Sequence, residues 1–272
     1  MKYLLIVIPM FIVALFIGAT SVFYFRLWPK PLNVDVLVSN PNPPYAALKV
    51  YSYETDSSWM SLLGFQEFFS EVILSYGDIH APQTSALFIN ERFDGYALDR
   101  VTDQGAVVVF DMGSTSCGFN RVYIFDVSTA SWNGSLDRQC FLTAFPDLQK
   151  YVAVDSELHT LFVRSITDGS IVKQLDLPEE QVGPTTRYIV SVAVSPDNKQ
   201  VALVTGPGDL GSTAMPTLFV WNIESGDFTS HLLPSAAVPP DAWLPNQLLA
   251  FDEETGEVVF QSDTESLRFS VQ

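Results

Sequence analysis

The sequence of 272 residues is poor in the side chains that carry most protein chemistry. It has 2 cysteines and 3 histidines, and 14 Lys and Arg residues stand against 31 Asp and Glu residues, giving a net charge of −17. Such an acidic surface repels the phosphate backbone, which excludes nucleic acid as a partner. The cysteines and the scattered His80, His159 and His231 do not form a zinc-binding pattern. No nucleophile elbow, Walker loop or dinucleotide fingerprint is present. The sequence therefore predicts no catalytic residue, no cofactor and no metal.

The two cysteines flank a predicted β-hairpin. Cys117 and Cys140 lie on either side of a strand predicted over 121–127 and a turn predicted over 128–135. A disulfide needs Cα atoms within about 7 Å, a distance that cross-strand neighbours satisfy. Two interpretations stay open at this point, a Cys117–Cys140 disulfide and a pair of buried thiols.

A long apolar run is the strongest feature that the sequence does contain. The 23 residues from Tyr3 to Phe25 include no charged side chain. As an α-helix they would span roughly 30 Å, the hydrocarbon thickness of a bilayer. We predict a transmembrane anchor over 1–27, followed by a proline-rich linker over 28–45. The side chains expected to contact lipid are Tyr3, Leu4, Phe11, Phe16, Phe23, Tyr24 and Phe25.

A cleaved secretory signal is the alternative to an anchor. Signal peptides have an apolar core of about 7–15 residues and a small-residue cleavage site. This run is longer and ends in aromatic residues that suit a membrane interface, although Ala19–Ser21 offers a weak cleavage site. The flanking charges, Lys2 against Arg26 and Lys30, are nearly balanced and do not set the orientation. The acidic composition and the cysteine pair favour an extracytoplasmic C-terminal domain.

The chain repeats itself after residue 95. One repeated element is a turn followed by a short apolar strand, and its turn residues Asp103, Asp147, Asp197 and Asn246 lie 44, 50 and 49 residues apart. Asp and Asn stabilise turns through their side chains, and proline presets the first turn position. The apolar run after each turn predicts a strand buried on both faces.

A second repeated element is a hairpin with a tight, often Gly-containing turn. Its copies are Leu161–Ile171, Leu218–Phe228, the partial Val122–Thr129 and the C-terminal Glu254–Phe260. Repeats of about 40–50 residues with several strands each are typical of β-propeller blades.

The clearest copy, over 187–234, resembles the blade repeat of WD40, YVTN and TolB-type β-propellers. It contains Ser195-Pro196-Asp197, then Val201-Ala202-Leu203, then Leu218–Asp227. The family's Trp-Asp pair closes the third strand, and Trp221-Asn222 and Phe125-Asp126 occupy that position. No Gly-His dipeptide precedes the repeats, so the strict WD40 hydrogen-bond network is not implied.

The resemblance covers about residues 100–272 and implies an all-β fold. We expect a β-propeller-like domain over 46–272 with about five blades, and whether the set is complete stays open. Apolar residues three and four apart predict a helical insertion near 59–74. The alternative fold is a β-sandwich.

Paired carboxylates are the one catalytic pattern to consider, because five-bladed propellers include glycoside hydrolases, which use two carboxylates about 5–10 Å apart. Asp111 and Asp155 each follow a predicted buried strand, a place that ordinary turn residues also occupy. The further candidates are Asp99, Asp103, Asp252 and Glu253.

The main functional hypothesis is a single-pass membrane protein with an extracytoplasmic interaction domain. Its partners would be the lipid bilayer and other membrane-protein subunits, and it would be an accessory or scaffold subunit rather than an enzyme. The alternatives are an extracellular glycan-acting hydrolase and a secreted or periplasmic binding protein.

Overall fold

The computed structural model describes the chain in segments. These are residues 12–15, 18, 33–38, 44–54, 68–90, 95–111, 121–135, 140–155, 160–177, 187–207, 216–234, 248–261 and 266–270. Residues 12–15 and 18 are helical, and the other regular structure in these segments is β-strand. Within the described segments no helix has the length and apolar character needed to cross a membrane. The seven predicted anchor residues, Tyr3 to Phe25, all lie outside these segments, so the anchor stays a prediction.

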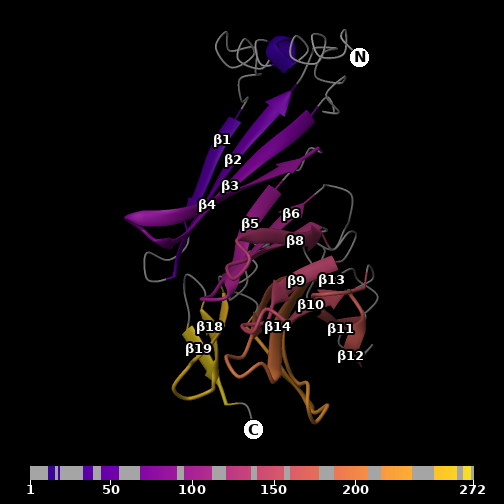
Figure 1. The fold of residues 1–272 in the computed structure, drawn as a ribbon. Helices are drawn as coiled ribbons and strands as arrows, with labels where there is room; N and C mark the ends of the chain where they lie inside the picture. The colour runs from indigo at the N-terminus through magenta and orange to yellow at the C-terminus, as the bar shows by residue number, and fades with distance from the viewer. Residues whose placement is uncertain are drawn as a thin grey trace. The chain divides into compact units, whose positions relative to one another are not determined.

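The chain divides into two compact units, each described here by itself. The first comprises Met1–Leu37, Ala47–Leu74 and Ala86–Arg92, and the second comprises Val38–Ala46, Ser75–Ser85 and Phe93–Gln272. The first sheet contributes to both units, with strand order β1 (Asn33–Val38), β2 (Tyr45–Glu54), β3 (Phe68–Asp78) and β4 (Ala81–Ile89) (Figure 1). In the first unit, Tyr53 stacks on Phe69 with ring centroids 4.6 Å apart, and the Tyr53 hydroxyl donates to Glu71 Oε2 at 3.1 Å.

β3 corrects the helix predicted near 59–74. Residues 68–74 belong to this strand, and residues 59–67 lie outside the described segments. Val72, Leu74 and Tyr76 are buried while the residues between them are only partly so, which is the alternation of a strand. Over a segment as short as 68–74, apolar residues three and four apart are compatible with the period of a helix and with that of a strand. The β-branched Val72 and Ile73 favour the strand.

Four further sheets follow in the second unit, each a meander in which consecutive strands pair antiparallel. The second sheet holds β5 (Gly95–Val101), β6 (Gly105–Asp111), β7 (Arg121–Asp126) and β8 (Ser131–Ser135). The third holds β9 (Cys140–Ala144), β10 (Lys150–Val154), β11 (Thr160–Ser165) and β12 (Ile171–Asp176). The fourth holds β13 (Arg187–Val194), β14 (Gln200–Pro207), β15 (Thr217–Asn222) and β16 (Phe228–Leu232). The fifth holds β17 (Leu249–Phe251), β18 (Val258–Gln261) and β19 (Ser266–Phe269).

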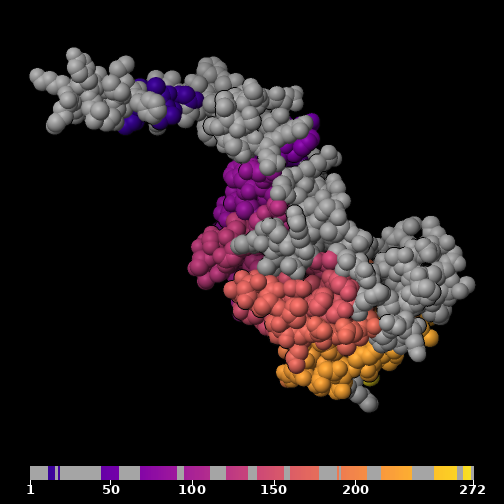
Figure 2. Space-filling model, turned by 90° about the vertical axis from the view of Figure 1, so that its right-hand side faces the viewer, coloured from indigo at the N-terminus to yellow at the C-terminus, as the bar shows by residue number. Residues whose placement is uncertain are grey.

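The core lies between these consecutive sheets. Val107 and Val109 of the second sheet pack with Phe141 and Tyr151 of the third. Two similar clusters join the third sheet to the fourth and the fourth to the fifth, and Figure 2 shows the salmon third sheet adjoining the orange fourth. The first strands approach one another in series, β5 to β9, β9 to β13 and β13 to β17. The alternative β-sandwich would divide its strands between two sheets, which is not this arrangement.

The repeated turns form as their residues predict. In the third sheet, Phe145 N–H donates to Lys150 O at 2.9 Å and Asp147 Oδ1 accepts from Gln149 N–H at 2.9 Å. In the fourth sheet, Ser195 and Asp197 make the same two bonds. The strands that follow, Tyr151–Val154 and Val201–Val204, are buried on both faces.

The C-terminal copy of the turn and strand differs from its prediction. Leu249 and Phe251 are buried but Ala250 between them is exposed, so this strand is buried on one face. It is the first strand of the fifth sheet within the described segments and lies against β13, while the predicted turn at 244–247 lies outside them.

Candidate binding pocket between the second and third sheets

In each of three consecutive sheets, the two hairpin turns at one end of the strands are bonded to each other. Within each sheet, the turn after the third strand donates a backbone N–H to the turn after the first strand. The bonds run from Val127 to Gln104 at 3.0 Å, from Ile166 to Gln149 at 2.9 Å and from Ile223 to Lys199 at 2.8 Å. We call the surface formed by turns 102–105, 126–131, 145–150, 165–170, 195–200 and 222–227 the turn face.

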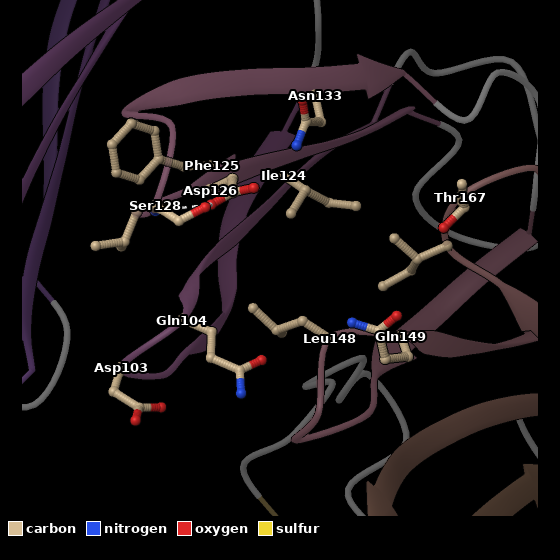
Figure 3. Close-up of a pocket in the computed structure, with 12 residues that line it drawn as sticks. Asp103, Gln104, Ile124, Phe125, Asp126, Ser128, Asn133, Leu148, Gln149 and Thr167 are labelled. Atoms are coloured by element: carbon tan, nitrogen blue, oxygen red, sulfur yellow. Dashed lines mark hydrogen bonds between the residues drawn. The ribbon is translucent and has the colours of Figure 1, made fainter.

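A pocket of about 840 Å³ opens on the turn face between the second and third sheets. Figure 3 shows Asp103, Gln104, Asp126 and Ser128 on the side of the second sheet, and Leu148, Gln149 and Thr167 on the side of the third. The pocket has an apolar floor and a polar rim. Its lining residues are Asp103, Gln104, Ile124, Phe125, Asp126, Val127, Ser128, Asn133, Leu148, Gln149, Ile166 and Thr167.

Two carboxylates stand on the rim, from two different turns of the second sheet. Asp126 Oδ1 accepts the backbone N–H and the hydroxyl of Ser128, both at 2.7 Å. The Ser128 hydroxyl bond is the main cause that lowers the pKa of Asp126 below its ordinary value. Asp126 therefore carries its negative charge throughout the physiological pH range.

Leu148 on the pocket floor has a strained backbone. Its φ is +52°, a left-handed conformation that side chains other than Gly, Asn and Asp rarely adopt. At the same place in the fourth sheet the chain has Asn198, with φ +62°, which suits this conformation. The Leu148 side chain is buried in the cluster between the second and third sheets. Burial of its apolar surface on the pocket floor offsets the strain.

Tyr76 of β3 supports the turn that carries Asp103. Its hydroxyl donates to the carbonyl oxygen of Thr102, and its ring lies 5.9 Å from that of Phe125. Burial, and secondarily the charge of Asp103, raise the pKa of Tyr76 above its ordinary value. The phenol stays protonated at neutral pH and keeps its hydrogen bond to the turn.

Only one of the two cysteines of the predicted disulfide lies in the described segments. Cys140 begins β9 and packs partly buried against the cluster between the third and fourth sheets. Cys117 lies outside the described segments, so the Cys117–Cys140 disulfide stays a prediction.

Of the carboxylates considered for hydrolysis, only Asp99 and Glu253 line a common pocket in the described part of the chain. Asp111 ends β6 and Asp155 follows β10, so both lie at the ends of second strands. The strands that approach one another across the sheets are instead the first strands. Asp103 belongs to the pocket described above. In the described segments no three His, Cys, Asp or Glu side chains are grouped to hold a metal ion.

The remaining candidates lie near the first strands or in turns. Asp99 and Glu253 line a smaller pocket of about 350 Å³ together with Arg100 and residues of β13 and β17. Asp252 is a turn residue that binds Arg268. His80 lies in the exposed turn after β3, His231 packs on Phe269 with centroids 5.1 Å apart, and His159 is outside the described segments.

Comparison with known proteins finds no matching family model and no matching curated protein. Among solved structures, the β-propeller domain of the Trilobed protease from Pyrococcus furiosus is 8% identical over 84% of this chain and 64% of that one, with a TM-score of 0.42. The WD40 domain of Toxoplasma gondii coronin is 8% identical over 87% and 64%, also at 0.42. The Dos1 propeller is 11% identical over 84% and 64%, at 0.43. This chain thus spans just under two thirds of the length of each.

The described strands between residues 95 and 269 form a β-propeller-like array of repeats. Meanders of consecutive strands, stacked face to face with their first strands in series, are the blades of this architecture. Trp221-Asn222 closes the third strand of its blade and Phe125-Asp126 closes that of another, as the repeat predicted. The second to fourth sheets are four-stranded blades, and the fifth has three strands within the described segments.

The sequence predicts the propeller turns but not the pocket between two blades. Asp103 is among the candidate carboxylates that the sequence offers. The other pocket residues Asp126, Leu148 and Gln149 are not predicted as site residues. The spacing Asp126-x-Ser128, repeated at Asp168-x-Ser170, is a signal for the turn alone. That two such turns border one cavity depends on how neighbouring blades pack.

Proposed function

We propose that this chain is a membrane-anchored, extracytoplasmic interaction protein, an accessory subunit that binds its partner through the turn face. The observation that carries the proposal is the backbone bond that joins the two turns within each of three consecutive blades. A surface of turns fixed in this way loses little conformational entropy on binding. The pocket between the second and third blades gives that surface a concave seat.

Membrane attachment is proposed from the sequence. The 23 uncharged residues from Tyr3 to Phe25 are long enough to span a bilayer, and the aromatic residues at their end suit an interface. A chain held at the membrane would present the propeller to subunits embedded beside it.

Isolation of the tagged full chain from its native membranes in mild detergent tests the proposal. We expect another membrane protein to copurify in a fixed ratio. Gln149→Arg places a long charged side chain on the turn face and should reduce that ratio several-fold. Gln261→Arg is the matched control, because Gln261 is exposed at the end of β18, away from the turn face. A lone monomer with no copurifying protein would contradict the proposal.

A further inference from the structure

The pocket between the second and third blades has an excess of negative charge. Asp103 and Asp126 come from different turns, and the described lining contains no lysine, arginine or histidine. Asp126 Oδ1 accepts the backbone N–H and the hydroxyl of Ser128, and hydrogen bonds from Thr129 also help to keep this carboxylate ionised. The other polar groups of the rim, from Gln104, Asn133, Gln149 and Thr167, are neutral. A cation entering the pocket would find acceptors on two sides.

The floor of the same pocket is apolar and firm. Ile124 and Leu148 are each 8% exposed and belong to the apolar cluster between the two blades. Inorganic cations gain nothing from such a floor. The methylene stem of a lysine or arginine gains from it, because it buries apolar surface while its charged end reaches an acceptor. A volume of about 840 Å³ exceeds one side chain, so neighbouring residues of the same ligand would fit.

From this combination we propose that the pocket binds a basic side chain, arginine or lysine, of an extended segment in a partner protein. This proposal rests on the proposed function and names the chemistry of the partner. The net charge of −17 acts in the same direction, because an acidic surface speeds the encounter with a basic partner. The guanidinium or ammonium group would lie between Asp103 and Asp126, with its stem over Leu148.

A peptide array tests the proposal with the full chain in detergent. The immobilised peptides form four series, with a central arginine, lysine, citrulline or glutamate. All four series use the same set of flanking sequences. We expect labelled protein to bind the arginine and lysine series, and to bind the citrulline series about tenfold more weakly because citrulline cannot donate a charge-assisted hydrogen bond to the carboxylates. Higher salt should weaken binding of the basic series.

Matched variants distinguish the effect of the pocket carboxylates on binding from the effect of the protein's overall negative charge. Asp103→Asn and Asp126→Asn should each weaken binding of the basic series about tenfold. Asp168→Asn is the control, because Asp168 makes the same pair of bonds to Ser170 that Asp126 makes to Ser128, at 3.1 and 2.8 Å, but does not line the pocket. Equal melting temperatures would show that all three variants fold.

Failure of the pocket proposal and failure of the proposed interaction role would give different results. Equal binding of the arginine and citrulline series, or equal loss in all three variants, would overturn the pocket proposal. If a membrane protein still copurified with Asp126→Asn as it does with the wild type, the interaction role would stand without this pocket. If nothing copurified with the wild type, the interaction role would fail whatever the array showed.

Discussion

Gly105 shows how closely two strands approach beneath the pocket. It begins β6 opposite Asp126, and a Cβ added there would overlap the backbone carbonyl oxygen of Phe125. Because the obstacle is backbone, it cannot move without breaking the pairing of β6 with β7. We expect Gly105→Ala to lower the free energy of unfolding by about 1–3 kcal/mol, measured by denaturant unfolding.

The control separates a clash from an unfavourable backbone angle. Gly226 has φ +82° but open space around its Cα, so Gly226→Ala should cost only about 1 kcal/mol. Equal costs at Gly105 and Gly226 would contradict the overlap with Phe125.

Asp252 makes stability depend on acid pH. The N–H of Thr255, at 3.0 Å, and then the guanidinium of Arg268, at 2.8 Å, lower its pKa from 3.8 to about 2. A lowered folded pKa stabilises the fold above about pH 3.8, and this contribution is lost as the pH falls toward 2. Asp252→Asn should therefore lower the melting temperature most near neutral pH, and the difference from wild type should shrink between pH 3.8 and 2.

Arg268→Met tests the order of these two causes. It removes the ion pair but keeps the Thr255 bond, so its pH dependence should lie between those of wild type and Asp252→Asn. A melting difference for Asp252→Asn that stays constant across the acid range would contradict the lowered pKa.

At the scale of elements, a single side chain joins the first strands of two blades. Asp99 lies at the irregularity in β5 between Leu98 and Arg100, and its Oδ2 accepts Ala144 N–H of β9 at 2.8 Å. Ala144 is fully buried. Asp99→Ala would leave that N–H without its acceptor, and we expect a loss of about 1–3 kcal/mol in the free energy of unfolding.

Asp99→Asn is the conservative comparison, because an amide oxygen can still accept the Ala144 bond. It should cost less than Asp99→Ala, and hydrogen exchange at the Ala144 amide should rise in the alanine variant above that in the asparagine variant. Equal exchange in both variants would show that this bond does not join the blades.

The elements that the sequence predicted best are those with turn chemistry of their own. The Pro146-Asp147 and Pro196-Asp197 turns fix where two blades begin their second strands, and the hairpins at Gly169 and Gly226 fix where their outer strands begin. No Pro-Asp pair lies in residues 55–67 to mark where β3 begins, so the apolar spacing predicts a helix where residues 68–74 form a strand. The pocket could not be predicted, since the left-handed φ of Leu148 and the packing of two blades do not follow from local sequence.

At the scale of the whole molecule, we propose that the apolar N-terminal segment holds the propeller at a membrane. We expect the full chain to stay with membranes through an alkaline carbonate wash and to keep Met1. Val13→Arg combined with Phe16→Arg should release it, because a charge at the centre of a spanning helix costs about 2.5–3.5 kcal/mol. Ser21→Arg, nearer the aromatic end of the run, should be tolerated better.

The N-terminal residue of the mature protein distinguishes an anchor from a signal. An anchored chain has an intact mass of 30.2 kDa, whereas cleavage after Ala19–Ser21 would give a mature protein that starts near Val22. Such a start, together with release by carbonate, would contradict the anchor and leave a secreted binding protein. The two outcomes also imply different partners. An anchored propeller would bind basic segments of proteins in the same bilayer, whereas a released propeller would bind basic segments of proteins that diffuse to it.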